Sequence, residues 1–242
     1  MGDGDLEIRN GAVIRRTATN MFEISFDGET VAVDLTLGQN EQYPPYFLSM
    51  HNIPREYFGV IHTGEGDGWD INRTCMSSIL MFHGKIYLID AGPNILYNLK
   101  SLGIGLNEIE GIFHTHAHDD NFTGLTDLIG ADHRIRYYST PLVRASVTKK
   151  LCALLSIEES RFENLFDVHD LDFDEWNNVD GLEVKPVLSP HPVETNILFF
   201  RAMWSQGYRT YAHFADIASF SILENMVTED PDEIGISPEY FE

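Results

Sequence analysis

The chain has 242 residues and a formal net charge of −22, from 16 Lys and Arg against 38 Asp and Glu. This acidity argues against sequence-independent binding of nucleic acid and against binding to an anionic membrane surface, because both need a basic face on the protein. Two cysteines are too few for a disulfide framework, no secretory signal opens the chain, and no apolar run is long enough to cross a bilayer. Composition therefore favours an acidic, soluble, cytoplasmic protein with a globular core.

The N-terminal part of the chain predicts strands and loops. Alternating apolar residues over 22–33, broken by a turn at 27–29, indicate a β-hairpin. Two prolines argue against a helix in the loop 39–46. A short strand over 60–63 runs into the glycine-rich loop 64–68, which we interpret as a mobile surface turn. The alternative for this loop is a place at the mouth of an active site.

The next elements predict strands joined by a helix. A hairpin has arms at 77–82 and 85–90, and its second arm is apolar on both faces, as in a strand inside a covered sheet. A helix begins near Asn94 and ends before Gly103, where glycine suits the residue after a helix. A further strand over 109–113 delivers the chain into a cluster of histidines and acids.

Helices and then strands complete the pattern. We expect a helix whose inward face carries Leu125, Leu128 and Ile129. A second helix starts at Pro141, with its apolar stripe on Val143, Val147, Leu151 and Leu154. The acidic segment 167–180 predicts a solvated surface loop. Strands follow at 182–188, 197–203 and 208–214, then a helix over 217–227, and no clear element over 229–242. The chain therefore predicts hairpins first, then β-α units, and then strands again. This order indicates sheets covered by helices, an α/β layered fold.

The stretch His114-Thr115-His116-Ala117-His118-Asp119-Asp120-Asn121 carries the chemistry. Histidines at alternate positions point to one side if the strand persists, and acids and an amide follow at the corner. Neutral imidazoles and carboxylates gathered in one place are the ligands of Zn²⁺, Fe²⁺ or Mn²⁺. A polar strand end with solvated histidines is the less favoured interpretation of this cluster.

This stretch resembles the His-x-His-x-Asp-His signature of the metallo-β-lactamase fold superfamily, closest to its tRNA-processing and cyclic phosphodiesterase branches. The resemblance extends to the strand and turn at 87–93, and the matching metal-site positions are His116, His118, Asp120, Asn121, His191 and Asp216. It implies an αββα sandwich of two mixed β-sheets covered by helices. We expect a single domain over 1–242, with a core at about 58–227 and residues 1–57 as an N-terminal extension of strands and loop.

Two departures from the family pattern concern the second metal position. Asn121 stands where the family has a histidine, and no histidine follows His213, although the family supplies a final one near its C-terminus. Either the chain is a fragment of a longer protein, or that ligand is missing.

The resemblance divides the donors into two metal positions. It implies that His116, His118 and His191 form one intact position, that Asp120 and Asn121 belong to the second, and that Asp216 bridges. We expect Zn²⁺ as one or two ions, a one-metal site ahead of a two-metal site, with Fe or Mn as the alternative metal.

Two further histidines need separate interpretation. His114 lies two residues before His116, so we expect it to orient the metal-binding groups, with a core histidine as the equal alternative. His213 lies three residues before Asp216 on a predicted strand, which puts the two side chains on opposite faces and argues against His213 as a ligand. A bulge there is the one arrangement that brings His213 into the place of the absent C-terminal histidine.

The resemblance implies a metal-dependent hydrolase that uses metal-activated water, on a small phosphodiester or related ester, with Asp120 orienting or deprotonating the water. The first alternative is a non-hydrolytic di-iron protein that binds, senses or reduces oxygen or nitric oxide. The second is a degenerate metal-binding regulatory domain. We expect a small-molecule substrate as the partner, no nucleic acid and no membrane. A homo-oligomer and an additional C-terminal domain stay open.

Overall fold

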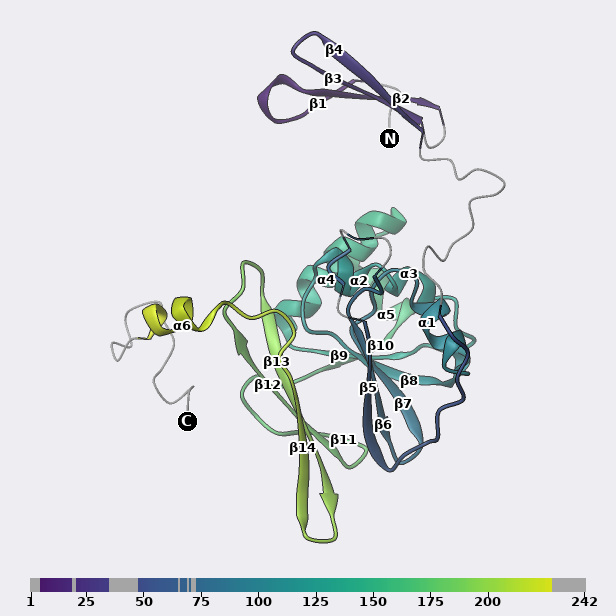
Figure 1. The fold of residues 1–242 in the computed structure, drawn as a ribbon, viewed down its shortest axis with the longest axis vertical. Helices are drawn as coiled ribbons and strands as arrows, with labels where there is room; N and C mark the ends of the chain where they lie inside the picture. The colour runs from purple at the N-terminus through teal and green to yellow at the C-terminus, as the bar shows by residue number, and fades with distance from the viewer. Residues whose placement is uncertain are drawn as a thin grey trace. The chain divides into compact units, whose positions relative to one another are not determined.

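The computed structural model describes residues 5–18, 21–34, 48–64, 66–68, 70 and 73–227 (Figure 1). Contacts divide the chain into two compact units, Met1–Pro45 and Tyr46–Glu242. The predicted loop 39–46 and the end 229–242 lie outside the described residues. The prediction of one domain over 1–242, with residues 1–57 as an extension, stays a prediction.

The first unit holds an antiparallel sheet in the order β1 (Leu6–Glu7), β2 (Val13–Ala18), β3 (Met21–Phe26) and β4 (Glu29–Asp34), with the short 3₁₀ helix η1 (Arg9–Gly11) after β1. The predicted hairpin is confirmed as β3 and β4. Its turn residues Asp27 and Gly28 both have positive φ, 47° and 80°, the backbone that suits a tight two-residue hairpin.

The second unit begins with a mixed six-stranded sheet. Its order is β10 (Asp167–Asp170), β9 (Arg136–Ser139), β8 (Ile109–Phe113), β7 (Lys85–Ile89), β6 (Ser77–Phe82) and β5 (Phe58–Gly64). Strands β7 to β10 run parallel, and the β5–β6 and β6–β7 pairs are antiparallel. The predicted hairpin over 77–90 and the strands over 60–63 and 109–113 are confirmed.

Helices accompany this sheet. They are α1 (Ile95–Ser101), η2 (Leu106–Glu108), α2 (Asp119–Phe122), α3 (Leu125–Leu128), α4 (Pro141–Leu155), η3 (Glu159–Arg161) and α5 (Phe162–Leu165). Gly103 follows α1 with a φ of 70°, as predicted for the residue after a helix. The apolar stripe of α4 is buried at Val143, Val147 and Leu151, but Leu154 is 58% exposed, because the helix turns that position away from the sheet.

A second sheet has the order β11 (Asn177–Val179), β12 (Leu182–Ser189), β13 (Thr195–Trp204) and β14 (Gly207–His213). All its pairs are antiparallel, so this sheet is not mixed as expected. The helix α6 (Phe220–Met226) follows β14 and begins later than predicted. The predicted α/β sandwich is otherwise confirmed.

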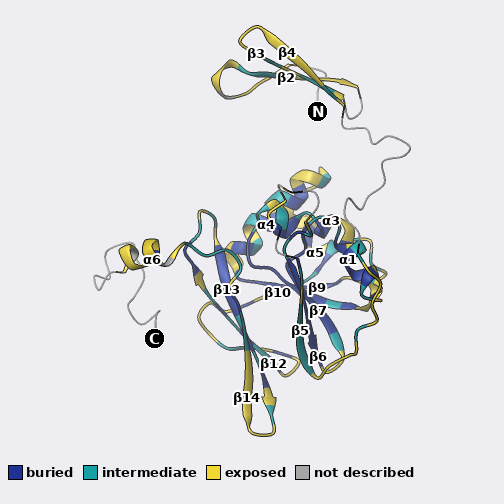
Figure 2. Ribbon diagram, viewed as in Figure 1, coloured by how far each residue is buried: buried dark blue, intermediate teal, exposed yellow. Residues whose placement is uncertain are grey.

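Two apolar cores hold the layers together. One lies between the six-stranded sheet and helices α1 to α5, with Ile79, Leu88 and Ile112 at its sheet face. The other lies between the two sheets, where Ile89, Phe113 and Phe200 meet. The central strands β6 to β9 of the six-stranded sheet are accordingly dark blue over most of their length in Figure 2.

The prediction of a solvated loop over 167–180 is wrong, because the segment contains β10 and β11. β10 adds to the parallel edge of the sheet beside β9, with Asp167 opposite Arg136. Charged side chains on an edge strand face water, so an acidic composition did not exclude a strand here.

The glycine-rich loop is partly buried among its described residues, and not wholly on the surface as predicted. Gly64 and Gly66 are buried, and the Gly66 N–H donates to the Thr74 carbonyl over 2.7 Å. No helix among the described residues is long and apolar enough to cross a membrane. The cytoplasmic location stays a prediction.

Candidate metal centre

The ends of neighbouring strands are tied together where the histidine stretch begins. β8 ends at Phe113, so the strand does not persist through the histidines as the sequence pattern assumed. The Asp90 N–H donates to the Phe113 carbonyl over 2.9 Å, and the His114 N–H donates to the Tyr138 carbonyl over 2.9 Å. From the second sheet, the Asn196 N–H donates to the Thr115 carbonyl over 3.0 Å. Both sheets therefore fix the backbone that carries the donors.

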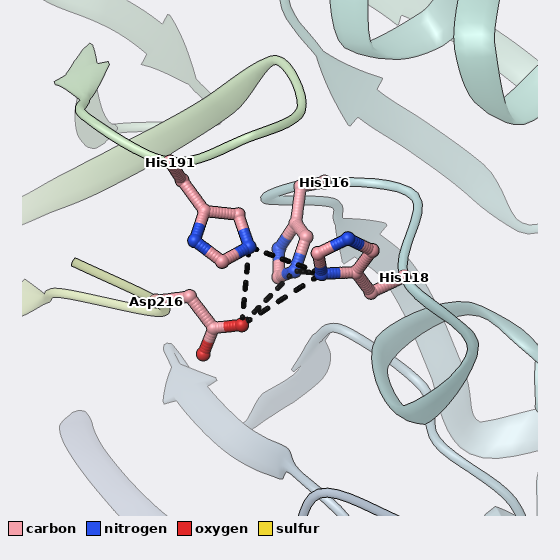
Figure 3. Close-up of side chains that lie close together, drawn as sticks. All are labelled: His116, His118, His191 and Asp216. Carbon is pink, nitrogen blue, oxygen red and sulfur yellow. Dashed lines mark hydrogen bonds and ion pairs between the residues drawn. The ribbon is translucent and has the colours of Figure 1, made fainter. Parts of the chain in front are cut away.

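Four predicted site residues converge from three loops. His116 and His118 lie between β8 and α2, His191 lies between β12 and β13, and Asp216 follows β14. Figure 3 shows the three imidazoles and the carboxylate turned toward one another. The donor atoms are Nε2 of His116, Nδ1 of His118, Nε2 of His191 and Oδ2 of Asp216. All four ligand atoms lie within 4.8 Å of one another.

The spacing of these atoms fits a tetrahedral ion. His118 Nδ1 lies 3.2 Å from His116 Nε2 and 3.0 Å from His191 Nε2. Asp216 Oδ2 lies 3.3, 3.9 and 3.5 Å from the nitrogens of His116, His118 and His191. Zinc bonds of 2.0–2.1 Å in a tetrahedron place donor atoms about 3.3–3.4 Å apart. Three imidazole nitrogens and one carboxylate oxygen at this spacing fit a divalent metal.

The tautomer of His116 is set by a buried chain of hydrogen bonds. The Thr115 hydroxyl donates to Asp90 Oδ2 over 2.6 Å, so it accepts the Nδ1–H of His116, 2.9 Å away. The proton on Nδ1 leaves a lone pair on Nε2, the atom that faces the other donors. The Thr115 N–H also donates to Asp90 Oδ1, and full burial raises the pKa of Asp90 to about 7.

Charges within the cluster favour a bound cation. The hydrogen bond from His116 holds the pKa of Asp216 below its ordinary value. Burial lowers the pKa of His116, but the carboxylates of Asp216 and Asp90 outweigh burial and raise it overall. Burial lowers the pKa of His191 and favours the neutral imidazole that a metal needs.

The remaining predicted residues lie outside this group. Asp120 is half-buried, and burial together with the charge of Asp216 raises its pKa. Asn121 is fully buried, with its Nδ2 3.4 Å from His116 Nε2 and its Oδ1 without a hydrogen-bond partner in the described structure. Among the described residues, His116, His118, His191 and Asp216 are the one group of four donors that converges. Asp120 is not part of this group, and the amide of Asn121 lies beside it, so the assignment of these two residues to a second metal position stays a prediction.

His114 and His213 also lie apart from the donors. His114 packs against the rings of Phe122 and Tyr137, and its Nε2 lies 4.0 Å from Asp90 Oδ1. His213 is buried at the end of β14, and its Nδ1 pairs with the Tyr211 hydroxyl at 3.2 Å.

Several supporting residues escaped the sequence analysis. Asp90 lies within the strand and turn at 87–93 and Thr115 within the histidine stretch, but no role for either followed from the sequence pattern. Gly92 has no room for a side chain, since a Cβ there would collide with the Asp120 carbonyl oxygen. The glycine-rich loop passes the same region, because a Cβ on Gly68 would lie 3.7 Å from Asp120 Cβ. The place of that loop at the mouth of an active site stays a prediction.

The fold has close counterparts among solved structures. The metallo-β-lactamase fold protein YhfI from Bacillus subtilis superposes with a TM-score of 0.52 at 14% identity, over 69% of this chain and 66% of that one. This likeness shows the metallo-β-lactamase fold, and the four converging donors at its strand ends suggest a divalent-metal site.

The family model of the anti-Pycsar protein Apyc1 matches residues 58–216, more than half of the chain. This chain belongs to that family.

Curated relatives include the cGMP-dependent 3′,5′-cGMP phosphodiesterase A of Dictyostelium discoideum, 22% identical over 138 residues, or 57% of this chain. The cAMP/cGMP-dependent 3′,5′-cAMP/cGMP phosphodiesterase B of the same organism is 21% identical over 159 residues, or 65% of this chain. The chain spans only 16% and 14% of the lengths of these two proteins.

Proposed function

We propose that this protein is a zinc-dependent phosphodiesterase that hydrolyses a small 3′,5′-cyclic nucleotide. The observation that carries the proposal is the convergence of three imidazole nitrogens and one carboxylate oxygen within 4.8 Å of one another. The names of the two Dictyostelium relatives support the substrate class. The net charge of −22 favours a small phosphodiester over a long nucleic acid.

The proposed chemistry is the addition of water to a phosphodiester. A divalent ion at this site supplies Lewis acidity, which polarises a phosphoryl oxygen and lowers the pKa of water. Asp120 accepts a proton from the attacking water, and its raised pKa makes it the stronger base for that step. The new bond joins the water oxygen to phosphorus, the bond to the ribose O3′ breaks, and the leaving oxygen takes a proton. The product is a nucleoside 5′-monophosphate.

The site is open to a small substrate on one side. The side chains of His118 and Asp216 are 40% and 34% exposed, whereas His116 is fully buried. A phosphate can therefore approach from the side of His118 and Asp216 while His116 anchors the rear of the site.

The di-iron alternative, with an oxygen or nitric oxide function, stays a prediction.

The test measures metal and turnover in the same preparations. Protein purified without a metal-affinity tag is expected to hold about one zinc per chain and to hydrolyse a 3′,5′-cyclic nucleotide. A chelator abolishes the turnover, and added Zn²⁺ restores it. His116→Ala is expected to lose most bound metal and turnover while its circular dichroism stays unchanged. His51→Ala, an exposed histidine outside the site, serves as the control. A folded His116→Ala protein with full metal content would refute the site.

A further inference from the structure

Lys150 on α4 contacts the segment that carries two of the metal donors. Its Nζ donates to the Ala117 carbonyl over 2.6 Å and lies 2.5 Å from Asp119 Oδ1. The same ammonium lies 4.6 Å from the centroid of the Phe122 ring. Lys150 therefore holds the residue between His116 and His118, and also the beginning and the end of α2.

This segment has little regular structure of its own. Residues 114–118 belong to no helix or strand, and α2 has only four residues, too few for a helix that is stable by itself. Charge-assisted hydrogen bonds and a cation–π contact are among the stronger polar interactions available to such a loop. The backbone of Lys150 is held in place by α4, because Val147 and Leu151 on the same helix are fully buried in the core.

We propose that Lys150 is a positioning residue of the metal centre: by holding Ala117 and Asp119 it keeps His116 and His118 in the geometry that binds the ion. It touches neither donor nitrogen, and it acts through the backbone between them. The inference rests on the proposed metal site and assigns to it a residue of α4.

The charge and the contacts of Lys150 predict opposite effects on metal affinity. An ammonium near a cation repels it, so removal of the charge alone tightens metal binding. Loss of the contacts frees the loop and weakens metal binding. The direction of the change therefore distinguishes a positioning role from a simple electrostatic one.

The experiment titrates the apoprotein with Co²⁺ and follows the visible absorption, which reports both the affinity and the geometry of the donors. Lys150→Met keeps the aliphatic stem and removes the ammonium, and it is expected to raise the Kd about tenfold or more and to change the band intensities. Lys149→Met removes the same charge from the adjacent, exposed position and is expected to leave the spectrum unchanged. Lys150→Arg, which keeps the charge and the donors, is expected to restore most of the affinity.

Asp119→Asn gives a second measurement in case Lys150→Met does not fold, since Asp119 is exposed and its loss weakens only one of the contacts. A smaller rise in Kd is expected for this variant. Unchanged or tighter Co²⁺ binding by folded Lys150→Met, or unchanged binding by Asp119→Asn where the first does not fold, overturns the positioning role alone. Failure of the wild-type protein to bind Co²⁺ or Zn²⁺ overturns the proposed metal site and this inference with it.

Discussion

The tautomer of His116 depends on Thr115, which is not one of the metal donors. The Thr115 hydroxyl joins His116 Nδ1 to Asp90, and all three side chains are fully buried. A buried polar group without a partner costs about 1–3 kcal/mol. The ring orientation of this ligand is therefore set by ordinary hydrogen-bond requirements of the core.

Thr115→Val is expected to lower metal affinity about 10–100-fold, because it leaves the Nδ1–H of His116 and a carboxylate oxygen of Asp90 without a partner. Isothermal titration of the apoprotein with Zn²⁺ measures the change. Thr148→Val is the matched control, since the Thr148 hydroxyl is buried and has no hydrogen-bond partner in the described structure. Equal Zn²⁺ affinity of Thr115→Val and Thr148→Val would show that the hydroxyl does not set the tautomer.

At the scale of elements, one ion-pair network ties the two sheets of the second unit together. Asp180, in the turn between β11 and β12, lies 2.9 Å from Lys85 on β7 and 2.7 Å from Arg136 on β9. Glu110 on β8 joins the same two cations, at 3.0 and 3.1 Å. The hydrogen bonds from Lys85 and Arg136 hold the pKa of Asp180 below its ordinary value.

Asp180→Asn is expected to lower the free energy of unfolding by about 1 kcal/mol at neutral pH, a small effect because these groups are partly exposed. A carboxyl with a depressed folded pKa stabilises the protein above its unfolded pKa, and that contribution is lost as the pH falls through the folded pKa. The difference between variant and wild type therefore shrinks below pH 3.8, the ordinary value for Asp.

Urea unfolding at several pH values measures this difference. Asp174→Asn is the control. Asp174 and Asp180 both have a positive φ, but Asp174 pairs with one cation, Lys185, whereas Asp180 pairs with two. If the difference in unfolding free energy between Asp180→Asn and wild type does not change with pH, the ion pairs of Asp180 are not its cause.

At the scale of the whole molecule, the metal centre belongs to the second unit. Both apolar cores consist, among the described residues, of side chains from Ile53 onward. All four donors lie in the same unit. The strands that carry the site therefore pack against other residues of the second unit, 46–242.

A chain of residues 46–242 is expected to fold with the zinc content of the full protein and a melting temperature within a few degrees of it. Calorimetry and elemental analysis of the two chains compare them directly. Loss of metal by a folded short chain would mean that the first unit contributes to the site.

Local sequence patterns were sufficient for the hairpins, for most strands and for the helix that starts at Pro141. Turn glycines, alternating apolar residues and a helix-starting proline act over a few residues, so their effect can be read along the chain. The prediction of a loop over the acidic segment 167–180 was wrong because charged residues indicate exposure to water, and an edge strand can be as exposed as a loop.

Residue types and their spacing along the chain were enough to indicate a metal site, because closely spaced imidazoles and carboxylates follow an apolar strand at positions that resemble a known metal signature. Which of these donors meet depends on the tertiary structure. It brings His191 and Asp216 from the ends of the second sheet to His116 and His118. It also places Lys150 against the loop that carries the two histidines. The physical reason is that a metal centre needs atoms about 3 Å apart, and such distances between remote segments are set by the packing of sheets and helices.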